Sequence, residues 1–182
     1  MRLYLSSYRI GDSAGSLLAL LSGGQEKSQT FPVRPRDRSD WGNGPRAAII
    51  ENALDLYSEE AREMHQREIY DPAAELASLG IGSNRLDLRK YFGRAEALEA
   101  ELAGYDLVWA VGGNAFVLRR AMQASGFDDV ITRMLDKDQI VYGGFSAGAV
   151  VAAPSLCGMH LMDDPNEVPR GTTPKRCGTA WG

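Results

Sequence analysis

Residues 143–154 read GGFSAGAVVAAP and place Ser146 between small residues. The run follows the apolar residues QIVY and precedes a helix-like stretch, which indicates a sharp strand-to-helix turn. A serine on such a turn is often held in unfavourable backbone geometry, so its neighbours must be small. Gly144, Ser146 and Gly148 satisfy the pattern G-x-S-x-G. The pattern favours a serine nucleophile for acyl transfer, and a small-residue turn without chemistry is the alternative.

Two backbone segments could stabilise the oxyanion that such a nucleophile generates. Ala147 can offer its N–H, aided by the N-terminus of the helix that follows. The turn Gly112, Gly113, Asn114 ends the apolar run YDLVWAV and is the natural source of a second donor. Alone it would be an ordinary strand–helix turn that uses glycine for positive φ. Together with the serine turn, it is interpreted as functional.

Apolar strand-like runs alternate with amphipathic helix-like runs along the chain. This alternation predicts an α/β fold with a parallel sheet covered on both faces. Catalytic sites in such sheets lie at the carboxyl ends of the strands, where both turns fall. The predicted strands are 2–8, 46–50, 84–88, 105–111 and 139–142. Two helices are predicted over 57–79 and 94–103. A third is capped by Ser13, and a fourth follows the GGN turn and stops at Gly126.

Bulk composition limits the classes of function. A chain of 182 residues, 44% hydrophobic and 24% charged, favours one globular domain. A net charge of −4 argues against nucleic-acid or membrane partners. Cys157 and Cys177 form no C-x-x-C motif and the histidines are not paired, so neither a disulfide framework nor a zinc site is expected. No cofactor is expected either. The N-terminus lacks a signal-peptide pattern, which predicts a cytoplasmic protein.

The segments AVGGNAFVLRRAM and YGGFSAGAVVAAPSL resemble the peptidase E (alpha-aspartyl dipeptidase) and cyanophycinase family. MRLYLSSYRIGD, AAIIENALD and LDLRKYF are also similar to members of that family. The resemblance implies a three-layer αβα sandwich with a mostly parallel sheet, like class I glutamine amidotransferases (flavodoxin-like). It further implies a single domain over 1–182, with a loop insertion at 23–45 and an incomplete C-terminal part.

The same resemblance implies a set of site residues. Ser146 would be the nucleophile, and the N–H groups of Gly113 and Ala147 would form the oxyanion hole, with Gly112 and Asn114 beside them. A downstream acid would orient the catalytic histidine. Asp163 is favoured over Asp164 because its Asp-x-Pro spacing suits the family better. A solvated turn carboxylate is the alternative for both.

A base for Ser146 is harder to find, because the chain has two histidines. His65 lies in the charged run EEAREMHQRE and is expected to be an exposed surface residue. His160, in CGMHLMDD, precedes the acid, whereas the family histidine follows it. A structural or surface role is therefore predicted for His160, with a base brought close by the fold as the alternative.

The last residues, TTPKRCGTAWG, do not continue the family pattern. With one choice of codons and a frame moved back by one base, they translate as Tyr-Asp-Pro-Glu-Ala-Val-Trp-Asp-Gly-Leu-Gly. That translation resembles the family's own continuation after VPRG. We therefore interpret the chain as a frameshifted or truncated family member, with a sequence error or a natural alternative tail as the other interpretations.

The function implied is hydrolysis of small peptides, chiefly dipeptides with an N-terminal aspartate, through an acyl-enzyme on Ser146. Without the family histidine, we expect weak or no activity. An exposed sheet edge would favour instability or association, for example as a homodimer. The alternatives are an α/β-hydrolase-type esterase and a non-catalytic amidotransferase-like module. A glutaminase would need cysteine in place of Ser146.

Overall fold

A computed structural model describes residues 1–23 and 44–169. Its centre is a five-stranded sheet in the order β1-β5-β4-β2-β3, and every pair of neighbouring strands is parallel. The strands are β1 Arg2–Ser6, β2 Arg46–Ile50, β3 Gly82–Arg85, β4 Leu107–Ala110 and β5 Val141–Phe145. Residues 24–43 of the predicted insertion and the divergent tail from residue 170 lie outside the described residues.

Strand β4 shows why the sheet is covered on both faces. Its side chains alternate, with Leu107 and Trp109 in one buried cluster and Val108 and Ala110 in another. All four residues are fully buried. Trp109 also pairs in register with Gly143 of β5, where a Cβ atom would lie 2.6 Å from the indole ring. The small residues of β5 therefore make room for large side chains of β4.

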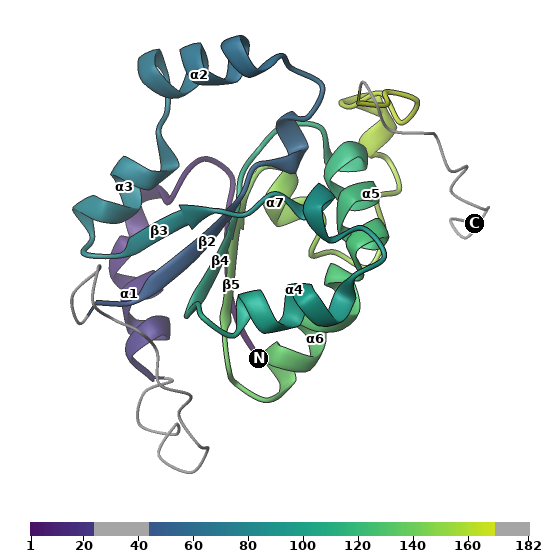
Figure 1. Cartoon of the computed structure of the whole chain (residues 1–182). Coiled ribbons are helices and arrows are strands. Elements are labelled where there is room, and N and C mark those ends of the chain that lie inside the picture. The colour runs from purple at the N-terminus through teal and green to yellow at the C-terminus, as the bar shows by residue number, and fades with distance from the viewer. Residues whose placement is uncertain (24–43, 170–182) are drawn as a thin grey trace.

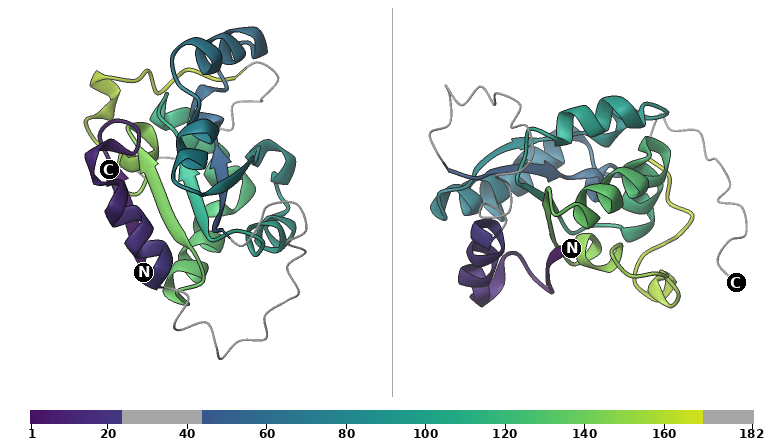
Figure 2. Two further views of the ribbon diagram at one scale, coloured as in Figure 1. Left: turned by 90° about the vertical axis from the view of Figure 1, so that its left-hand side faces the viewer. Right: turned by 90° about the horizontal axis from the view of Figure 1, so that it is seen from below.

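Helices cover the two faces of the sheet, as Figures 1 and 2 show. On one face lie α1 Ala14–Gly23 and α3 Pro72–Ser78, and on the other α4 Ala95–Leu102, α5 Ala115–Ser125, α6 Phe127–Asp136 and α7 Ala147–Val150. Helix α2, Glu59–Glu68, buries none of its residues and stands above the carboxyl ends of the strands (Figure 1). Short 3₁₀ turns are η1 Gly11–Ser13, η3 Asn52–Leu54, η4 Leu88–Tyr91 and η5 Met159–Leu161. The predicted three-layer α/β architecture is confirmed.

Several predicted boundaries were wrong, for local reasons. The helix predicted over 57–79 is two helices, because Asp71 caps a new helix that has Pro72 in its first turn. Helix α6 was not predicted and starts directly after Gly126, which adopts φ 73°. The strand predicted at 84–88 ends at Arg85. The strand predicted at 139–142 continues to Phe145, so Ser146 follows it without a linker.

Strand β1 forms one edge of the sheet and has only β5 as a neighbour among the described residues. Leu3 and Leu5 on this strand are 42% and 47% exposed. Association through this edge stays a prediction. Within the described ranges, none of the helices has the length and apolar character needed to cross a membrane.

Candidate active site

Ser146 occupies the sharp turn between β5 and α7. Its backbone has φ 50° and ψ −119°, a conformation that a non-glycine residue rarely adopts, and its side chain is exposed. The two flanking glycines are needed for close packing. A Cβ atom on Gly144 would lie 2.7 Å from the carbonyl carbon of Gly148, and one on Gly148 would overlap the carbonyl oxygen of Ala110. The strained geometry and small neighbours expected of a serine nucleophile are therefore present.

The GGN turn lies directly beside the serine, because β4 and β5 are neighbours. A Cβ atom on Gly112 would lie 3.0 Å from Cβ of Ser146 and 3.4 Å from its Oγ. Gly113 has φ 141°, and a Cβ atom there would lie 2.5 Å from the carbonyl oxygen of Ala53. Glycine is therefore required at position 113 for two reasons, its dihedral angle and its packing.

Asn114 caps helix α5 and does not point a free amide at the serine. Its Oδ1 accepts hydrogen bonds from the N–H groups of Phe116 and Val117, at 2.9 and 3.0 Å. Its Nδ2 donates to the carbonyl oxygen of Asp164 at 3.2 Å and to a carboxylate oxygen of Glu167 at 2.8 Å. The side chain thus stabilises the helix N-terminus and fastens the segment after η5 to it.

The two predicted acids lie at this helix end as well. Asp163 accepts a hydrogen bond from the N–H of Ala115, 2.8 Å away, in the first turn of α5. Asp164 is exposed and accepts from the backbone N–H of Asn166 at 2.8 Å. His160 lies on η5 and is exposed. None of these three residues lines the cavity described next.

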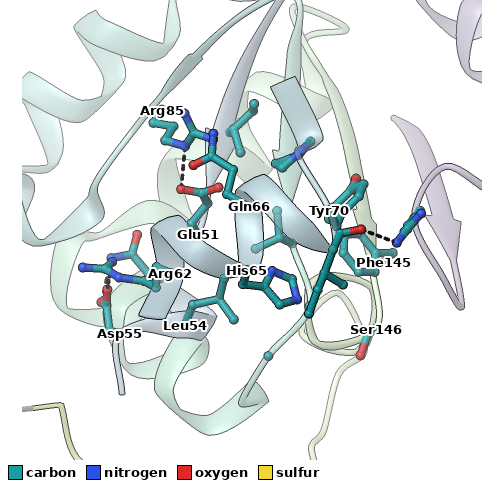
Figure 3. A pocket seen from close by; sticks show the side chains of 18 of the residues that line it. Glu51, Leu54, Asp55, Arg62, His65, Gln66, Tyr70, Arg85, Phe145 and Ser146 are labelled. Atoms are coloured by element: carbon teal, nitrogen blue, oxygen red, sulfur yellow. Dashed lines mark hydrogen bonds and ion pairs between the residues drawn. The ribbon is translucent and has the colours of Figure 1, made fainter. Parts of the chain in front are cut away.

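A cavity of about 690 Å³ opens at the carboxyl ends of the strands (Figure 3). Ser146, Phe145, Gly112 and Gly113 form part of its wall. Helix α2 contributes another part, and Figure 3 shows His65 on this helix pointing into the cavity. The segments after β1, β2 and β3 complete the lining with Tyr8, Arg9, Glu51, Asn52, Asp55, Tyr70, Arg85, Asp87 and Arg89, among others.

The position of His65 changes the interpretation of that residue. Its side chain is exposed, as expected, but it shares the cavity with Ser146. No hydrogen bond joins a histidine to Ser146 within the described part of the chain. The sequence gives little sign of this placement, because α2 is mostly polar and buries none of its residues against the sheet.

Charged side chains in the cavity are mostly paired. Arg85 Nε donates to Glu51 at 2.8 Å, and Arg89 forms a bidentate pair with Asp87 (Figure 3 shows the first). Asp55 is buried and lies 3.5 Å from both Arg62 and Arg89. Nothing in the sequence pattern singled out this network, because its members come from three separate segments.

Burial and pairing shift two of these carboxyl groups in opposite directions. Burial raises the pKa of Asp55, and the hydrogen bond from Asn52 only partly opposes it. Burial would also raise the pKa of Asp87, but hydrogen bonds from Arg89 and Asn52 outweigh it and lower the pKa to about 2. Asp87 is therefore held ionised by its partners.

Comparison with known proteins decides the family. The model of peptidase family S51 matches residues 45–175, most of the chain. The chain belongs to peptidase family S51. Membership agrees with the resemblance to peptidase E and supports a peptidase, and it favours that class over an α/β-hydrolase.

Two curated relatives in Listeria are similar over part of this S51 chain. Uncharacterized peptidase Lin0382 of Listeria innocua serovar 6a is 31% identical over 70 residues, which are 38% of this chain and 33% of the relative. Uncharacterized peptidase Lmo0363 of Listeria monocytogenes serovar 1/2a is 30% identical over 88 residues, 48% of this chain and 42% of the relative. The matched regions therefore span less than half of the length of these relatives.

Solved structures share the S51 chain's fold. A 1.5 Å crystal structure ascribed to a peptidase E from Listeria monocytogenes EGD-e superposes with a TM-score of 0.60 at 21% identity, covering 94% of this chain and 70% of that one. A peptidase from an acI-B1 actinobacterium gives a TM-score of 0.51 at 19% identity, with 82% and 54% covered. Both likenesses show the fold alone, an α/β fold that the chain shares with these two peptidases.

Proposed function

We propose that this S51 protein is a serine peptidase that hydrolyses small peptides, chiefly dipeptides with an N-terminal aspartate, through an acyl-enzyme on Ser146. The observation that carries the proposal is the geometry of Ser146. It is an exposed serine in a strained turn, in the wall of a cavity, with the glycines of the GGN turn against its side chain. That combination is typical of a nucleophile poised for acyl transfer.

In the proposed reaction, Ser146 Oγ attacks the scissile carbonyl carbon. The backbone N–H groups of Gly113 and Ala147 stabilise the oxyanion. As the C–N bond breaks, the proton that the Ser146 hydroxyl has given up ends on the amine of the second amino acid, which leaves. Water then hydrolyses the acyl-enzyme. Asp163 as the acid of a triad stays a prediction, since an imidazole would have to lie beside it and its carboxylate binds the N-terminus of α5.

We further propose that this chain is a slow enzyme. A serine needs a base to become a strong nucleophile, and a positioned base contributes roughly 10²- to 10⁴-fold in rate. The support is that no described histidine donates to or accepts from Ser146 Oγ, although His65 lies in the same cavity. We expect His65→Ala to change the residual rate by less than about tenfold. A larger loss would make His65 the base.

The test combines labelling of Ser146 with turnover. A fluorophosphonate should label the chain slowly at Ser146, as located by peptide mass spectrometry, and Ser146→Ala should remove the label. Hydrolysis of Asp-Leu should be weak and should disappear in the same variant. Rapid hydrolysis that Ser146→Ala abolishes would refute the slow enzyme but support the serine peptidase. Absence of any labelling would refute the nucleophile and favour a non-catalytic module.

A further inference from the structure

The loop that follows β1 is fastened to the nucleophile turn. The backbone N–H of Ser146 donates to the carbonyl oxygen of Ser6 at 3.3 Å. The hydroxyl of Ser6 donates in turn to the carbonyl oxygen of Arg9, and Tyr4 Oη donates to the carbonyl oxygen of Ile10 at 2.6 Å. The hydroxyls of Ser6 and Tyr4 thus fix the carbonyl groups of Arg9 and Ile10, and Ser6 also binds the nucleophile turn.

The side chain of Arg9 is oriented as well. Its guanidinium carbon lies 4.7 Å from the ring centroid of Tyr8 and 4.8 Å from that of Tyr70. Its Nη2 donates to the carbonyl oxygen of Ile69 at 2.8 Å. The ring of Tyr70 meets that of Phe145 edge-on at 5.5 Å, so this support continues to the residue before Ser146.

The backbone of Arg9 is strained, with φ 48° at a residue other than glycine. Such strain persists only where the surroundings impose it, and it is often found at functional positions. Here it directs a half-buried cation into the wall of the cavity that contains Ser146.

Arg9 differs from the other arginines of the cavity in its charge partners. Arg62, Arg85 and Arg89 each lie within 3.5 Å of a carboxylate. Arg9 has no carboxylate partner among the described residues, and its buried Nε has no hydrogen-bond acceptor there. A guanidinium has five N–H donors, and only Nη2 of Arg9 has an acceptor within the described chain. Among the described residues, Arg9 is thus an oriented cation of the cavity that no carboxylate neutralises.

We propose that Arg9 is a specificity-determining residue that binds a carboxylate of the peptide whose carbonyl Ser146 attacks. A guanidinium fork matches a carboxylate with two parallel hydrogen bonds, and the tyrosine rings keep that fork in place before substrate arrives. The inference rests on the proposed function of Ser146. The carboxylate is either the side chain of an N-terminal aspartate or the C-terminus of the dipeptide, and the peptides of the test distinguish these sources.

The test measures binding without turnover, in the Ser146→Ala background, by calorimetry with Asp-Leu, Asn-Leu and Asp-Leu amide. Arg9→Gln should weaken Asp-Leu binding by roughly 10- to 100-fold, the loss expected for a charge-assisted contact. Arg9→Lys, which keeps the charge but not the fork, should be intermediate. Arg85→Gln is the matched control, because Arg85 lines the same cavity but is already paired with Glu51, and it should bind nearly as the parent does.

The peptide whose affinity is the same for the parent and for Arg9→Gln identifies the carboxylate that Arg9 binds. If the aspartate side chain is bound, Asn-Leu binds weakly and equally to the parent and to Arg9→Gln. If the C-terminus is bound, Asp-Leu amide is the peptide that binds weakly and equally to the parent and to Arg9→Gln. Near-ultraviolet circular dichroism of each variant verifies that it is folded.

Three results would overturn the role of Arg9: equal binding of all peptides by parent and Arg9→Gln, an equal loss in Arg85→Gln, or no peptide binding at millimolar concentration. Fluorophosphonate labelling tests Ser146 separately, because the reagent carries no carboxylate. Labelling should change by less than about threefold in Arg9→Gln, well below the contribution of a catalytic base. Labelling therefore tests whether Ser146 is a nucleophile, and calorimetry tests independently whether Arg9 binds a carboxylate.

Discussion

Asp163 accepts a hydrogen bond from the backbone N–H of Ala115, with 2.8 Å between Oδ2 and the nitrogen. The contact joins the segment after the serine turn to the first turn of α5, the helix that the GGN turn introduces. A carboxylate in this place satisfies a helix N–H that has no partner within the helix and interacts favourably with the helix dipole. The residue predicted as the acid of a triad therefore has a structural role of its own.

We expect Asp163→Ala to lower the free energy of unfolding by about 1 kcal/mol, the usual effect of losing a helix cap. Asp164→Ala is the matched control, because within the described ranges that exposed side chain binds only Asn166, and it should have a smaller effect. Urea unfolding followed by circular dichroism measures both. Equal effects of the two substitutions would contradict the capping role.

Gly113→Ala should destabilise the protein by about 2–4 kcal/mol, since a new Cβ would combine backbone strain with overpacking against Ala53. Gly158→Ala controls for the strain alone. Gly158 also has positive φ, 87°, but no atom lies within 4 Å of its added Cβ. Thermal unfolding of the two variants should show the larger loss for Gly113. The packing argument fails if Gly158→Ala costs as much.

Ser146→Gly should stabilise the chain by about 1 kcal/mol while it abolishes fluorophosphonate labelling. The reason is that φ 50° strains a serine but not a glycine. Ser146→Ala also loses the label but retains the strain, so its stability should stay near that of the parent. Chemical denaturation compares the three proteins. A glycine variant no more stable than the alanine variant would show that the turn is relaxed.

The stability of the chain at acid pH should depend on Asp87. Because partners lower its pKa to about 2 in the folded state, the unfolded chain binds more protons between that value and the ordinary pKa of 3.8. Stability from this group is complete above about pH 5 and is lost as the pH falls through 3.8 toward 2. Asp87→Asn should remove on the order of 1–2 kcal/mol of that pH dependence.

Urea unfolding at several pH values from 5 to 2 checks this prediction for Asp87, with the parent chain measured beside the variant. Asp55 acts in the opposite sense, because its pKa is raised by burial, so its ionisation costs stability as the pH rises. An unchanged pH dependence in Asp87→Asn would mean that the pairing with Arg89 contributes nothing.

The sequence by itself determined the fold class, because buried parallel strands need continuous apolar runs such as LVWA and each crossover needs a helix. It also located the serine turn and the GGN turn, because tight turns and close backbone approach select glycine. Helix boundaries were less predictable. Pro72 begins a new helix inside a run whose periodic pattern continues, and α6, which starts directly after Gly126, was not predicted.

Only the tertiary structure decided which side chains share a cavity. His65, Arg9 and Asp87 come from helix α2 and from loops after different strands, and each looks in sequence like an ordinary surface residue. Parallel strands bring their carboxyl ends to one edge, so residues far apart in the chain meet there. The direction of α2 and the strained turn at Arg9 depend on packing between separate segments. A local sequence pattern does not predict such packing.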